Sequence, residues 1–126
     1  MSLAVLLVLH AIVTFAAGMA LIVAPNFIPG AIGIQLEPSQ FLVPYLLGTA
    51  EIALAFLSFY ARKLTDAQAL RLVSATFIVF HASTALVEFL AFVQGASAGV
   101  WGNIAVRALV VILFAYYGLM QTRNQS

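Results

Sequence analysis

The sequence predicts an all-α integral membrane protein in which four transmembrane helices form one bundle. Hydrophobic residues make up 64% of the 126 residues and charged residues only 7%, whereas a soluble domain has roughly 45–50% apolar and about 25% charged residues. A domain of this size has too little interior to hide so much apolar surface from water. Four apolar stretches each approach or exceed the ~20 residues that a helix needs to cross the hydrocarbon core. We therefore expect lipid to surround most of the side chains.

The four helices are expected at residues 3–23, 41–60, 66–94 and 100–120, within a single domain that covers residues 1–126. None of these stretches alternates polar and apolar residues as a transmembrane strand does. The first stretch has no basic residues before it, and it is longer than the apolar region of a signal peptide, about 7–15 residues. We expect it to be retained as a helix.

Helix-breaking and helix-capping residues separate the stretches. The connection between the first two helices contains five breakers: Pro25, Pro29, Gly30, Gly33 and Pro38. Pro44 falls in the first turn of the second helix, where its missing N–H does little harm. Thr65 and Gln68 have the spacing of a capping box, which predicts Thr65 as the N-cap of the third helix.

The first connection, residues 24–40, is too apolar for a free loop, because it contains Phe27, Ile28, Ile32 and Ile34. We expect a short interfacial segment that lies on the outer membrane surface. The alternative is a lid over the bundle.

Basic residues lie at one end of the predicted helices. Arg62, Lys63 and Arg71 flank the second connection and Arg123 lies in the C-terminal tail, whereas the other two connections contain no Lys or Arg. Because loops rich in Lys and Arg stay in the cytoplasm, both termini and the middle connection are expected on the cytoplasmic side.

Five ionisable residues fall inside the predicted helices: His10, Glu51, His81, Glu88 and Arg107. A charge at the bilayer centre costs about 2.5–3.5 kcal/mol on insertion scales, so such residues usually face the protein interior and find partners. From a rise of about 1.5 Å per residue, Glu51 and His81 lie near the middle of the membrane. Glu88 and Arg107 share a level nearer the outer face. The sequence therefore predicts two pairs, Glu51 with His81 and Glu88 with Arg107.

Other polar residues extend these pairs into one polar seam. Thr84 shares a helix face with His81, and Asn103 shares a face with Arg107 four residues later. The candidates for ligand binding or proton exchange are Glu51, His81, Glu88, Arg107, Asn103 and Thr84. The simpler interpretation is an ion pair and hydrogen bonds that decide which helices adjoin, and His10 is expected to be structural. No catalytic residue is identified.

Metal and haem binding are less expected, although two histidines and two glutamates lie within the helices. The Glu-x-x-His pattern of metal sites in helix bundles is absent, and the chain has no cysteine. A haem between His10 and His81 stays an alternative. We predict no metal site, and the sequence identifies no cofactor.

A first helix that ends in Ala24 and Pro25, a loop with Gly33, a second helix that opens with Tyr-Leu-Leu-Gly-Thr-Ala-Glu at residues 45–51, and an intramembrane Arg107 complete the pattern. This pattern resembles the DoxX-like group of small bacterial four-helix membrane proteins, many of them of unknown function. The resemblance implies a four-helix bundle in the bacterial cytoplasmic (inner) membrane. Some relatives are associated with electron transfer or quinones, but this chain has no obvious quinone or metal signature, so that activity is not carried over.

Three functions stay open. The first is an accessory or structural subunit, not an enzyme, that packs against itself or a larger membrane complex through Thr14, Gly18, Gly48 and Ala55. The second is a binding protein or enzyme for an apolar small molecule, in which Arg107 would hold an anionic or carbonyl group. The third is a dimeric proton-coupled transporter. Nucleic acid is not an expected partner, because the net charge is +1 and the basic residues form no patch.

Overall fold

The computed structural model describes residues 1–123, and these residues form helices and connections with no strand among them. Four helices are long and apolar enough to cross a membrane, as expected from the sequence. They are α1 (Leu3–Val23), α3 (Leu42–Ala61), α4 (Ala67–Val93) and the stretch Val100–Met120. That last stretch consists of α5 (Val100–Phe114) and a wider π-helical segment, η2 (Ala115–Met120), which leads into the short α6 (Gln121–Arg123).

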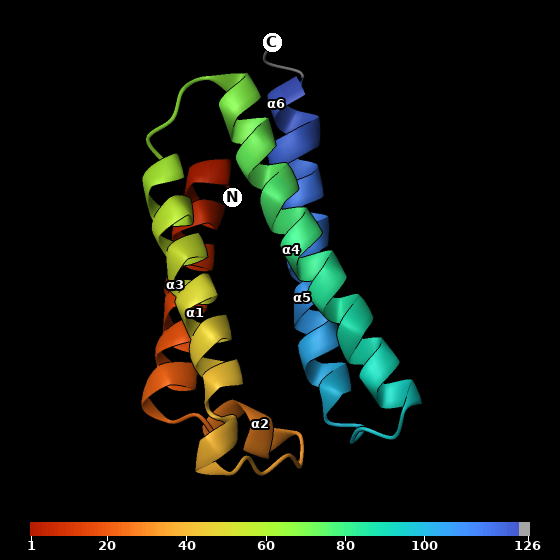
Figure 1. The fold of residues 1–126 in the computed structure, drawn as a ribbon. Helices are drawn as coiled ribbons and strands as arrows, with labels where there is room; N and C mark the ends of the chain where they lie inside the picture. Colours follow the sequence, from red (N-terminus) through yellow and green to blue (C-terminus); the bar gives the residue numbers. More distant parts are fainter. Residues whose placement is uncertain (124–126) are drawn as a thin grey trace.

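The four long helices form two side-by-side pairs (Figure 1): α1 packs on α3, and α4 packs on α5. The N-terminus, α6 and the α3–α4 connection lie at one end of the molecule, which we call the termini end. The short helix α2 (Phe27–Ala31) and the α4–α5 turn lie at the opposite end, the α2 end. The two pairs lean together at the termini end and diverge toward the α2 end.

The hydrophobic core lies toward the termini end, where all four long helices contribute to it. Its buried members are Leu6, Leu7, Ala61, Val73, Phe77 and Phe114. The rings of Phe77 on α4 and Phe114 on α5 are fully buried, with centroids 5.1 Å apart. This cluster of apolar contacts therefore joins the two helix pairs at one end.

Helices α1 and α3 touch backbone to backbone through two glycines. A Cβ atom added to Gly18 would lie 2.7 Å from the Gly48 carbonyl oxygen, and a Cβ on Gly48 would lie 2.8 Å from the Gly18 carbonyl oxygen. Thr14 and Ala55 are also buried. Small residues allow helices to approach this closely. Gly18 and Gly48 thus contact each other within this molecule, and Thr14 and Ala55 are covered by it.

The outward faces of the helices expose large apolar side chains, among them Val13, Leu46, Val79 and Ile112. Monomeric soluble proteins rarely expose contiguous apolar patches of more than a few hundred Å². Lipid chains can cover such faces, and the helices satisfy their own backbone hydrogen bonds as a bilayer requires.

The start of α4 corrects the predicted cap. Asp66, not Thr65, is the N-cap, and its carboxylate accepts a hydrogen bond of 2.6 Å from the Ala69 N–H. Aspartate caps at least as well as threonine, and its negative charge also interacts favourably with the positive end of the helix dipole. Pro44 lies in the first turn of α3, where the sequence placed it.

The segment 24–40 is folded, with α2 and a short 3₁₀ turn, η1 (Pro38–Gln40). The Asn26 side chain donates to the Leu36 carbonyl (2.9 Å) and accepts from the Leu36 N–H (2.7 Å), which draws the segment into a compact fold. A Cβ added to Gly99 in the α4–α5 turn would lie 3.2 Å from the Cα of Ile32. The segment therefore reaches across to the other helix pair at the α2 end.

Candidate functional site

A chain of hydrogen bonds links α3, α1, α4 and α5 beside the core. The Ser58 hydroxyl donates to the Leu7 carbonyl (2.8 Å), and the Ser58 oxygen lies 3.0 Å from Nδ1 of His10. Nε2 of His10 lies 2.9 Å from Nε2 of His81, and Nδ1 of His81 lies 3.1 Å from Nη1 of Arg107. All five residues lie within the four long apolar helices, and the side chains of His10, Ser58 and His81 are buried.

The two ends of this hydrogen-bond chain, Arg107 and Ser58, determine which ring nitrogens of His10 and His81 carry protons. A guanidinium only donates, so Nδ1 of His81 accepts and a neutral His81 carries its proton on Nε2. Nε2 of His10 then accepts a hydrogen bond from Nε2–H of His81, and Nδ1–H of His10 donates one to the Ser58 oxygen. The other end agrees, because a Ser58 hydroxyl that donates to a carbonyl can only accept from His10. A second proton on either ring would place two donors face to face, so both imidazoles are neutral in this arrangement.

The proton positions can be tested by nitrogen NMR, because the chain has only two histidines. In bilayers at neutral pH, we expect one protonated nitrogen per ring, Nδ1 in His10 and Nε2 in His81. Ser58→Ala removes the acceptor for His10 and should weaken that tautomer preference. A doubly protonated ring, or the same tautomer in both residues, would contradict the assignment.

Two carboxylates flank the guanidinium of Arg107. Nε of Arg107 lies 3.4 Å from Oε1 of Glu88, and Nη2 lies 3.7 Å from Oε1 of Glu51. Asn103 donates a hydrogen bond to the same oxygen of Glu88. The other oxygen, Glu88 Oε2, is buried and has no hydrogen-bond partner among the described residues. One buried cation therefore holds two acidic side chains from different helix pairs.

The predicted pairing is half correct. Glu88 and Arg107 form the expected ion pair, whereas the predicted pair of Glu51 with His81 is wrong. Both ring nitrogens of His81 are occupied, one by His10 and one by Arg107, and Glu51 contacts Arg107 instead. Pairing depends on the rotation of each helix about its axis, which the predicted depths do not specify.

Two side chains of this hydrogen-bond chain, those of His10 and Ser58, were not among the predicted site residues. His10 was expected to be structural, although an ionisable residue inside a spanning helix is a signal for a functional position. Ser58 carried no such signal, since serine is common in helix-helix contacts within membranes.

A cavity of about 580 Å³ opens between the two helix pairs toward the α2 end. Five of the six candidate residues line it: Glu51, Thr84, Glu88, Asn103 and Arg107. His81 does not line the cavity and contacts it through Arg107. The rest of the wall is mostly apolar, and part of it comes from segment 24–40, including Ile28 and Ile32. That segment therefore covers part of the cavity, as the lid alternative requires.

No known protein family, no curated protein and no solved structure matches this chain. The resemblance to the DoxX-like group stays a prediction, and the function has to be argued from the cavity.

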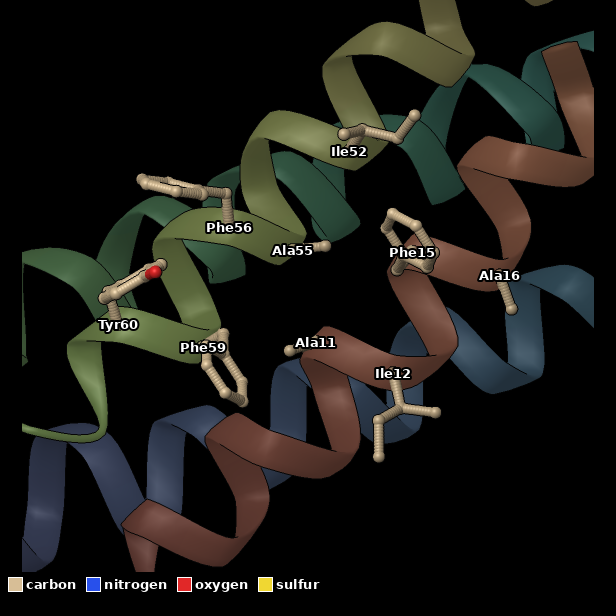
Figure 2. A pocket seen from close by; sticks show the side chains of 9 residues that line it. All are labelled: Ala11, Ile12, Phe15, Ala16, Ile52, Ala55, Phe56, Phe59 and Tyr60. Atoms are coloured by element: carbon tan, nitrogen blue, oxygen red, sulfur yellow. The ribbon is translucent and has the colours of Figure 1, made fainter.

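A second hollow, of about 470 Å³, lies along α1 and α3 (Figure 2). Its lining comprises Ala11, Ile12, Phe15, Ala16, Ile52, Ala55, Phe56, Phe59 and Tyr60. The Tyr60 hydroxyl is the one polar side-chain group among these nine residues, and it lies at one end of the hollow. No charged side chain lines it, so it is a surface that lipid chains can fill.

The geometry of the histidines does not accommodate a metal ion between them. Their Nε2 atoms are 2.9 Å apart, the distance of a direct hydrogen bond, whereas two nitrogens bound to one tetrahedral metal at about 2.0–2.1 Å would lie roughly 3.3 Å apart. Within residues 1–123, no group of three His, Cys, Asp or Glu side chains could hold a metal ion.

Proposed function

We propose that this protein binds an amphipathic small molecule in the cavity between its two helix pairs. The observation that supports this most directly is the pairing of an apolar wall with a buried carboxylate oxygen, Glu88 Oε2, that lacks a hydrogen-bond partner among the described residues. Leaving a buried acceptor unpaired costs about 1–3 kcal/mol, more when the group is charged. Glu88 lines the cavity, so a rotation of its carboxylate that brings this oxygen to a ligand donor recovers this free energy.

Two further features favour ligand binding over a purely structural role. A volume of about 580 Å³ falls within the range of small-molecule sites, about 300–1,000 Å³, whereas an ion pair that only joins helices needs no such space. The small residues through which an accessory subunit would pack, such as Gly18 and Gly48, contact each other inside this chain.

We also propose that the four helices form a transmembrane bundle with the termini end in the cytoplasm and the cavity toward the outer face. The support is that Arg62 and Lys63 lie in the α3–α4 connection, which is at the termini end, and that Arg71 lies near the start of α4. The positive-inside rule places loops flanked by such basic residues in the cytoplasm. The chain has no cysteine, so single cysteines report their own side. An impermeant maleimide should label Ser97→Cys in intact cells and Thr65→Cys only after lysis, and the reverse pattern would overturn the orientation.

Filling the cavity should abolish ligand binding without unfolding the protein. Gly102 on α5 lines the cavity, and a Cβ added there would meet no atom within 4 Å. Gly102→Phe should therefore fit, gain helix propensity and occupy ligand space. We expect the affinity for a decyl amphiphile, such as decanol or decylammonium, to fall by roughly tenfold or more, a change of about 1.4 kcal/mol or more.

The matched control is Ile112→Phe, which adds an aromatic ring on the exposed face of the same helix. It should leave binding unchanged. Native mass spectrometry from neutral detergent micelles measures the bound fraction, and thermal unfolding checks the fold. If Gly102→Phe binds the amphiphiles as tightly as the unmodified protein does, the cavity is not the binding site.

A further inference from the structure

The charges that line the cavity do not balance. Glu51 and Glu88 both contact the single guanidinium of Arg107, and the hydrogen-bond chain keeps His10 and His81 neutral. With both carboxylates ionised, the wall carries one negative charge in excess. In a low-dielectric site an unbalanced charge is costly, so this wall favours a ligand that brings one positive charge.

The wall also has carboxylate oxygens without a hydrogen-bond partner in the part of the chain that the structure describes. Glu88 Oε2 has no partner among the described residues. Glu51 is buried, with 6% of its side chain exposed, and its 3.7 Å ion pair with Arg107 is longer than a hydrogen bond. The Nε and Nη1 groups of Arg107 already interact with Glu88 and His81. A ligand that enters here therefore meets carboxylate oxygens that need donors.

The α2 end of the molecule presents no positive charge that would repel a cation. Neither segment 24–40 nor the α4–α5 turn contains Lys or Arg, and segment 24–40 contributes the exposed carboxylate of Glu37. The basic residues Arg62 and Lys63 lie in the α3–α4 connection at the termini end, and Arg71 lies near the start of α4. The approach to the cavity is thus more favourable for a cation than for an anion.

We propose that the amphipathic ligand is an alkylammonium ion, with one positive charge, N–H donors and an apolar body. This inference rests on the proposed function and specifies its ligand. The ammonium donates to the carboxylate of Glu88, which turns Oε2 toward it, and lies beside Glu51. Its apolar body packs against Val43, Leu47 and Val106 of the wall. Hydrogen bonds between charged groups are roughly twice as strong as neutral ones, so the head group dominates selectivity. The expectation that Arg107 would hold an anionic or carbonyl group is replaced by one in which Arg107 orients the two carboxylates.

Four probes with the same decyl chain separate these features: decylammonium, decyltrimethylammonium, decanol and decanoate. They differ in charge and in N–H or O–H donors, and binding is measured by native mass spectrometry of the intact protein in neutral detergent. We expect decylammonium to bind roughly 10- to 100-fold more tightly than each of the other three, the range that a hydrogen bond to a charged group supports.

Glu88→Gln tests the acceptor itself. Glutamine retains an oxygen for Arg107 and Asn103, but it replaces the free carboxylate oxygen by a donor and removes the excess charge. The preference for decylammonium over decanol should fall to within about threefold, since it rests on a hydrogen bond to a charged group. Glu37→Gln removes the same charge outside the cavity and should keep the preference.

The outcomes distinguish the two proposals. If decylammonium and decanol both fail to bind saturably, the proposed function fails. If they bind and Gly102→Phe prevents it, but decanol, decanoate or decyltrimethylammonium matches decylammonium, the function stands and the alkylammonium assignment is overturned. Retention of the full preference in Glu88→Gln would overturn the assignment as well.

Discussion

Arg107→Met is expected to lower the free energy of unfolding by about 3–5 kcal/mol, the loss found when one partner of a buried ion pair is removed. Methionine fills much of the space of arginine but supplies no charge and no N–H. Glu51 and Glu88 would lose the cation that they share, and Nδ1 of His81 would lose its donor. The same side chain joins α5 to both α3 and α4, so its loss also weakens the contact between the two helix pairs.

Rescue of this variant separates electrostatic loss from lost packing. Glu88→Gln added to Arg107→Met should restore part of the stability, because Glu51 still lacks a cation. Adding Glu51→Gln as well should restore most of it, since no buried carboxylate then remains unpaired. Arg71→Met, at an exposed position of α4, is the control and should change stability by less than about 0.5 kcal/mol.

Unfolding in detergent, followed by circular dichroism, measures these differences. A loss below about 1 kcal/mol for Arg107→Met, the range of an exposed ion pair, would mean that Arg107 is not the buried centre of the site. Absence of rescue in the triple variant would count against the shared ion pair.

Gly48→Ala is expected to destabilise the protein by about 1–3 kcal/mol, the usual effect of overpacking a tight contact. The added methyl group would overlap the backbone carbonyl oxygen of Gly18, at 2.8 Å, and a side-chain atom of Ile22 at the same distance. Backbone cannot rotate away as a flexible side chain can, so α1 and α3 must separate along their length. Gly48→Leu should have a larger effect for the same reason.

Gly102→Ala provides the matched control, because it makes the same change at a helical glycine with open space around it. There alanine should be neutral or stabilising by up to about 1 kcal/mol, the difference in helix propensity. Gly18→Ala combined with Gly48→Ala should deviate from additivity, since the two residues contact each other. Equal effects of alanine at positions 48 and 102 would show that α1 and α3 do not pack through this glycine.

The helices were predictable because their signals are local. The expected ranges 41–60 and 66–94 differ from α3 and α4 by one residue at each end, since apolar runs and breakers such as Pro38 act on their immediate neighbours. The cap of α4 was missed because Thr65 and Asp66 are adjacent and both can cap, and only the backbone conformation decides between them.

The site was predictable in composition but not in connectivity. Ionisable residues inside apolar helices turn inward wherever lipid would otherwise surround them, and Glu51, His81 and Arg107 are indeed buried. Whether His81 meets Glu51 or His10 depends on helix rotation and tilt, which vary without changing the depth of a residue. The open cavity was equally hidden, because it arises from the divergence of two helix pairs and not from any one segment.

Apolar composition and the helix-breaking and capping residues were sufficient to specify four long apolar helices and the polar residues that they carry, because hydrophobicity and capping act over a few residues. The backbone contact of Gly18 with Gly48, the partners of Arg107 and the space beside Glu88 were decided only in the tertiary structure. These features depend on how rigid helices rotate, tilt and approach one another, and a one-dimensional pattern does not record those degrees of freedom.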